Sequence, residues 1–262
     1  MNKVKNSILL TLALILSIII PFDGHAQDSN SLLWKVEGNG IQPSYLLGTI
    51  HILPKADFEM KEKVKKAFKE ADQIALELDM DDPSMQADMM KNMVLGNGKN
   101  LKDYVTDDEY KILDEALIKV AGQGMAAFGM MKPVTVSSML TVSMMGKETA
   151  SFELSFIKMA AEQNKEILGL ETVAEQFAVF DKIPYEDQLD DVVEMLVNEA
   201  ETTELFENMV KAYKNEDLAA LLKLINTQMD DPAEIEALLD DRNKNWIPKI
   251  GEISAEKSTF EY

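Results

Sequence analysis

The sequence predicts an α/β protein with a small mixed sheet, a large helical insertion and a helical C-terminal half. Short strand-like runs of apolar residues are separated by stretches in which apolar side chains recur at helical spacing. A helix-like stretch also lies between two of the early strands, which favours a right-handed parallel crossover. The helical stretches dominate the middle and the end of the chain.

The early part of the sheet is predicted from residues 32–80. In chain order we expect a hairpin, a helix and a strand: strands 32–36 and 44–50 joined at Asn39-Gly40, helix 58–71, and strand 73–80. Pro54 ends the second strand of the hairpin. A further strand is expected much later in the chain, at residues 165–170.

A helical insertion is expected at about residues 83–163, and helices over 185–253 complete the chain. Within these regions the helices are predicted at residues 106–121, 134–145, 185–213, 217–228 and 232–240. Eleven of the 17 methionines fall between Met80 and Met145. They indicate adaptable core packing in the insertion, or alternatively a flexible apolar groove for a peptide or lipid.

The N-terminus is typical of a signal peptide. Lysines precede an apolar run over residues 8–20, and Gly24 and Ala26 are the small residues expected before a cut. We therefore expect residues 1–26 to be removed, leaving residues 27–262 as one domain in the periplasm or outside the cell. An uncleaved anchor is the alternative, although the run is short against the roughly 20 residues of a spanning helix. After cleavage no stable membrane span is expected.

Composition excludes several classes of function. The 46 acidic and 26 basic residues give a net charge of −20, which disfavours nucleic acid as a partner. The chain has no cysteine, so disulfides and a Cys/His zinc site are excluded. Motifs of serine hydrolases, phosphate-binding loops and His-Glu-x-x-His metalloproteases are absent from the sequence.

Polar side chains lie where the predicted strands end. His51, Glu77, Asp79 and Glu171 all fall at or just beyond strand ends, where ligands collect in parallel sheets. Glu77 and Asp79, two residues apart, are expected to project from one face of their strand. Each residue also has a simpler explanation: His51 as a loop cap, for example, and Glu171 as an acid at a helix N-terminus.

Histidine plus carboxylates is a donor set suited to Zn²⁺, Mn²⁺ or Co²⁺, or to an acid–base cluster without metal. The acidic run after Glu77 resembles the start of a calcium loop. However, Ser84 stands where the turn glycine is needed and Met90 where the final glutamate is needed, so calcium is discounted.

The segments LLWKVEGNGIQPSYLLGTIHILP, ADQIALELDM, ILGLETVAEQ and LLDDRNKNWIPKI resemble the TraB/GumN family, to which the TIKI proteases are related. Gly48-x-x-His51 resembles the family's first Gly-x-x-His motif, and Glu77, Glu171 and Arg242 match its later polar positions. The resemblance implies a metal-dependent hydrolase that acts on a peptide or protein. It implies His51 and Glu77 as metal ligands, with Glu77, Glu171 and Arg242 in catalytic positions.

One part of the family pattern is missing from this sequence. Members normally continue into a further strand and a second Gly-x-x-His, whereas here that strand is expected to be only beginning at Tyr262. We therefore expect a truncated or frame-shifted product, or else a protein that works differently or has lost catalysis. In the chain as given, bound metal is expected to be weak or absent and catalysis impaired. The alternative is a non-catalytic protein that binds a peptide or partner.

Overall fold

The computed structural model describes residues 16–17, 30–146, 148–228 and 236–262, and it confirms the α/β class. The expected signal peptide lies outside the described residues, apart from β1 (Leu16–Ser17). This short strand pairs antiparallel with β4 (Thr49–Ile50). Within the described ranges, no helix combines the length and apolarity needed to cross a membrane.

The strands predicted from sequence form most of the main sheet. β2 (Leu33–Gly38) and β3 (Ile41–Leu47) make the expected antiparallel hairpin. β6 (Gln73–Leu78) and β8 (Ile167–Glu171) pair in parallel, with Leu78 opposite Glu171. α2 (Glu62–Glu70) connects the hairpin to β6, as the strand–helix–strand pattern indicated.

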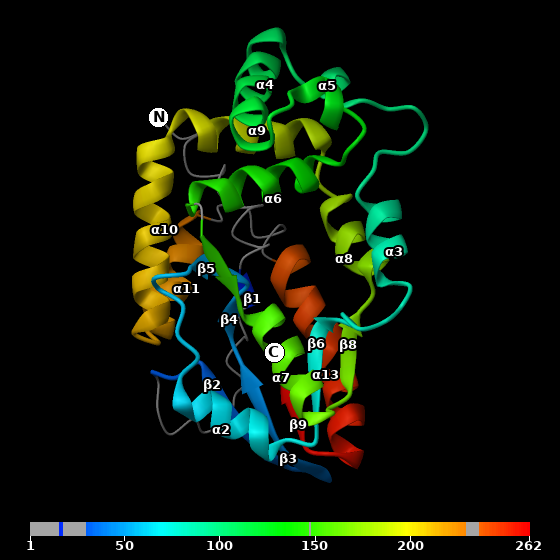
Figure 1. Ribbon diagram of the computed structural model, residues 1–262, viewed down its shortest axis with the longest axis vertical. Helices are drawn as coiled ribbons and strands as arrows, with labels where there is room; N and C mark the ends of the chain where they lie inside the picture. The colour runs from blue at the N-terminus through cyan, green and yellow to red at the C-terminus, as the bar shows by residue number, and fades with distance from the viewer. Residues whose placement is uncertain (1–15, 18–29, 147, 229–235) are drawn as a thin grey trace.

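The central strand of this sheet was not predicted from the sequence. The final strand, expected to be only beginning at Tyr262, is already formed as β9 (Thr259–Glu261). β9 lies between β3 and β6, parallel to both, and gives the order β2-β3-β9-β6-β8 (Figure 1). The sequence analysis missed it because a strand this short has little periodicity to detect, and its partners on β6 and β3 lie 186 and 215 residues away along the chain.

Aromatic packing holds β9 in place on one face of the sheet. Phe260 is fully buried, and its ring lies 5.5 Å from Phe68 on α2 and 5.1 Å from Phe156 on α7 (Phe152–Gln163), measured between ring centroids. Because side chains alternate along a strand, Glu261 faces the opposite side. There it packs under α13 (Asp241–Glu256), where Ser254 donates to it at 2.6 Å.

The insertion is helical, as expected, but its apolar side chains are divided between two separate hydrophobic cores. Its elements are α3 (Met85–Asn92), η1 (Leu101–Tyr104), α4 (Asp107–Ala121), α5 (Met125–Phe128), α6 (Pro133–Met144), β7 (Thr149–Ser151) and α7. α4, α5 and α6 pack with α9 (Tyr185–Val197) at the upper end of the molecule in Figure 1. β7 pairs with β5 (Ile52–Pro54), and α7 returns to the sheet. Most insertion methionines are buried or half-buried, in keeping with core packing; Met90 and Met130 are exposed.

Two boundaries in the C-terminal half differ from the prediction. The helix predicted over 185–213 is interrupted at Asn198, which separates α9 from α10 (Glu199–Lys214). The helix predicted over 232–240 lies partly outside the described residues, and its last part is a π-helix, η2 (Glu236–Asp240). α11 (Leu218–Gln228) agrees with the helix predicted over 217–228, and α8 (Val173–Phe180) begins just after Glu171, where a helix N-terminus was considered.

Candidate functional site

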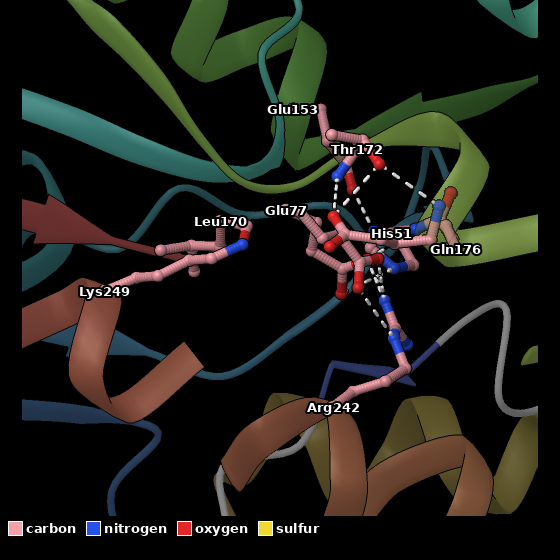
Figure 2. A network of polar contacts seen from close by, with 10 residues as sticks. His51, Glu77, Glu153, Leu170, Thr172, Gln176, Arg242 and Lys249 are labelled. Carbon is pink, nitrogen blue, oxygen red and sulfur yellow. Dashed lines mark hydrogen bonds and ion pairs between the residues drawn. The ribbon is translucent and has the colours of Figure 1, made fainter. Parts of the chain in front are cut away.

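Four residues chosen from sequence meet at one edge of the sheet. Glu77 lies near the carboxyl end of β6, Glu171 ends β8, and His51 follows β4. Arg242 reaches them from the first turn of α13, as Figure 2 shows. The parallel pairing of β6 and β8 brings the two glutamates together, because parallel strands present their carboxyl ends at the same edge.

Arg242 joins the two glutamates directly. Its Nη2 lies 2.8 Å from Glu77 Oε2 and 2.6 Å from Glu171 Oε1, and its Nε donates to Glu171 Oε2 at 3.2 Å. The guanidinium also stacks on Trp246, 4.8 Å from the ring centroid. The side chains of Arg242, Glu77 and Glu171 are only 11%, 7% and 6% exposed, so both carboxylates depend on this cation. Arg242 is the only arginine in the sequence, and this fact alone could have marked it as a candidate site residue.

Gln176 also binds Glu77 and was not predicted. Its Nε2 donates to Glu77 Oε2 at 2.8 Å from the second turn of α8. A capping box fixes the start of that helix, because Thr172 and Glu175 exchange hydrogen bonds. Gln176 lies only five residues after Glu171, and this closeness along the chain was the one sequence feature that could have pointed to it.

His51 lies near the other carboxylate oxygen of Glu77, Oε1. Its Nε2 is 3.7 Å from Glu77 Oε1, while Nδ1 contacts the carboxylate of Glu153, with Tyr262 Oη 3.4 Å away. Neither Glu153 nor Tyr262 was identified from sequence. Glu153 follows a helix start, where an acidic residue is ordinary, so nothing in its local sequence linked it to His51.

Burial and neighbouring charges set the protonation of the site. Burial lowers the pKa of His51, but the charges of Glu153 and Glu77 outweigh it and raise that pKa to about 9. Burial likewise tends to raise the pKa of Glu153, yet its hydrogen bonds and the His51 charge lower it overall. Burial raises the pKa of Glu171 in spite of the hydrogen bonds from Arg242. The charges of Glu153 and Glu77 favour the protonated form of His51, so a metal bound at Nε2 would have to displace the proton there.

Asp79 does not join this cluster. β6 ends at Leu78, and the polar neighbours of Asp79, Asp81 and Asp82, come from its own loop. Burial and these acidic neighbours raise the pKa of Asp79 to about 6. The expectation that it accompanies Glu77 on one strand face is wrong because the strand stops one residue too early.

The donor set fits a divalent ion in part. Two ligands of a tetrahedral zinc ion lie roughly 3.4 Å apart, close to the 3.7 Å between His51 Nε2 and Glu77 Oε1. Nevertheless, the described part of the chain contains no group of three histidine or acidic residues arranged to hold a metal. In addition, Arg242 binds both Glu171 oxygens and one Glu77 oxygen, so these oxygens are already engaged.

Comparison with known proteins places the chain in a family. A profile of the TraB/PrgY/gumN family matches residues 32–261, and the chain belongs to that family. Its similar relatives include the metalloprotease TIKI2 of Danio rerio, 34% identical over 93 residues, and TIKI2 of Xenopus tropicalis, 34% identical over 92 residues. Each match covers 35% of this chain but only 18% and 17% of the relative. No solved structure matches.

Proposed function

We propose that this protein is a hydrolase, acting on peptides or proteins, whose active site is the cluster of His51, Glu77, Glu171 and Arg242. The observation that carries the proposal is their convergence at one sheet edge, from four segments that are distant in sequence. Family membership and the metalloprotease relatives support the reaction class.

The chemistry would be divided among these residues. His51 Nε2 and Glu77 Oε1 would hold a divalent ion such as Zn²⁺, Mn²⁺ or Co²⁺, which would activate water and polarise the scissile carbonyl. Alternatively, Glu77 would act as the base that takes a proton from the bound water. Arg242 and Glu171 hold Glu77 in position, and the guanidinium provides positive charge for a developing oxyanion.

We further propose that residues 27–262 alone bind such an ion weakly and that their catalysis is impaired. Weak binding is supported by the site geometry, in which only two donors, His51 Nε2 and Glu77 Oε1, face one another. Calorimetry with each ion should give weak binding that falls further in His51→Ala. Tight binding that is unchanged by His51→Ala would remove His51 from the site.

Peptide hydrolysis tests the reaction class. The purified chain is incubated with a mixed peptide library and with Zn²⁺, Mn²⁺ or Co²⁺, and products are read by mass spectrometry. Slow cleavage is expected that requires the ion and is lost in His51→Ala and Glu77→Gln. Glu162→Gln, which changes an exposed glutamate on α7, is the matched control and should retain it. Cleavage that survives both site variants would refute the assignment.

A second candidate, non-catalytic peptide binding, is favoured by a groove away from this site. The groove has a volume of about 430 Å³, and its apolar lining includes Met144, Met145, Phe206 and Val210. In the library experiment, peptides retained uncleaved by the chain but released by Val210→Asp would support this function. Exposed Val197 provides the control, Val197→Asp.

Export is proposed from the sequence of residues 1–26. N-terminal sequencing of exported protein is expected to begin near Gln27. Protein that keeps Met1 in a membrane fraction would contradict cleavage.

A further inference from the structure

Glu153 is the carboxylate on which three side chains next to the site converge. It accepts hydrogen bonds from Ser151 Oγ and from the hydroxyl of Tyr262, and it contacts Nδ1 of His51. Its side chain is 18% exposed, close to the 20% of His51. A half-buried carboxylate with this many donors is held in one orientation, because each hydrogen bond restricts its rotation.

The backbone brings Glu153 to His51 by strand pairing. β5 and β7 are antiparallel, and their register places Ile52 opposite Ser151. His51 precedes Ile52, and Glu153 lies two residues beyond Ser151. Ser151 then caps α7 by accepting from the Leu154 N–H at 3.3 Å, which fixes the helix start that carries Glu153.

We infer that Glu153 is a positioning residue that holds His51 with its Nδ1 proton toward Glu153 and its Nε2 toward Glu77. This inference rests on the proposed role of His51 as a ligand. A histidine ligand usually donates its other ring N–H to a carboxylate, a backbone carbonyl or a water, which fixes the tautomer and makes the ligand nitrogen more basic. The geometry at His51 has this form, since Nδ1 faces Glu153 and Nε2 lies 3.7 Å from Glu77 Oε1.

A purely structural role would require less of Glu153. It would tie β5 to α7 through an ion pair and leave the tautomer of His51 unspecified. The ring tautomer therefore separates the two roles, while stability does not. The sequence suits the measurement, because it contains only two histidines, His51 and His25.

The first experiment is NMR of the full chain labelled with ¹⁵N-histidine. His25→Gln identifies the signals of His51, and spectra are taken at alkaline pH, where the ring is neutral. Couplings from the ring nitrogens to the ring carbon-bound protons distinguish the two tautomers. We expect wild-type His51 to carry its proton on Nδ1. A wild-type ring protonated on Nε2 overturns the inference without any Glu153 variant.

The second experiment uses Glu153→Gln, which keeps the side-chain volume and removes the charge. Its matched control is Glu162→Gln, on the exposed face of the same helix. We expect Glu153→Gln to give a mixture of His51 tautomers and to weaken Zn²⁺ binding, measured by calorimetry, by about 10- to 100-fold. The control should change neither.

The outcomes separate this inference from the proposed function. If Zn²⁺ does not bind even the wild type, the proposed metal site fails, and the tautomers alone decide the role of Glu153. If Glu153→Gln keeps a pure Nδ1–H tautomer and the zinc affinity of the control, Glu153 does not position the ring. Circular dichroism of each variant confirms that the fold is retained.

Discussion

Replacing Arg242 with leucine should destabilise the fold strongly, because it leaves two buried carboxylates without their cation. The change removes three charge-assisted hydrogen bonds, of 2.6, 2.8 and 3.2 Å, and the stacking on Trp246. Removing one partner of a buried ion pair costs about 3–5 kcal/mol. Protonation of the two carboxylates does not remove this cost at pH 7, because protonating a carboxyl group of ordinary pKa itself costs about 3 kcal/mol at that pH.

The cost of Arg242→Leu should depend on pH with a definite sign. Without the cation, the folded state holds the pKa of Glu171 further above its ordinary value of 4.5, so it binds more protons than the unfolded state. Stability therefore falls as pH rises from 4.5 through the raised folded pKa. The loss relative to wild type should be smaller at about pH 5 than at about pH 8. Adding Glu77→Gln and Glu171→Gln to Arg242→Leu should restore most of the lost stability.

Urea unfolding followed by circular dichroism measures these free energies. Lys244→Leu is the matched control, because it removes an exposed cation from the same helix and should cost less than about 0.5 kcal/mol. A loss below about 1 kcal/mol for Arg242→Leu, or a loss independent of pH, would refute the view that the two carboxylates depend on Arg242.

Three further predictions concern the fold around the site. Glu261→Gln should stabilise the protein at about pH 8 by at most about 3 kcal/mol and have little effect at about pH 4. Burial raises the pKa of Glu261 from 4.5 to about 7, so ionisation of this carboxyl group costs stability as the pH rises through that range. Thermal unfolding at both pH values measures the difference. Phe260→Ala should cost about 3–5 kcal/mol in urea unfolding, because it empties the aromatic contact that holds β9 against α2 and α7; a cost under about 1 kcal/mol would mean that β9 contributes little to the sheet. Thr106→Ala should cost about 1 kcal/mol through loss of the α4 capping box and leave Zn²⁺ binding unchanged, which calorimetry can check.

Local sequence was sufficient for most elements of the fold. The hairpin, α2, β6, β8 and α4 were predicted, because turn residues, apolar spacing and helix-start residues act within a few residues of one another. β9 was missed at its true position because it is held by partners on β3 and β6. The break at Asn198 was likewise missed, since helical periodicity continues across it.

The sequence by itself singled out the candidate residues of the site: one histidine at a strand end, two glutamates on later strands and, through the family resemblance, Arg242. Only the tertiary structure decided how they are paired. Arg242 binds Glu77 and Glu171, while His51 turns its Nδ1 toward Glu153. Residue type and local pattern specify what a side chain can bind. Its actual partner depends on strand register and helix docking, and these bring Glu153 to His51 from 102 residues away along the chain.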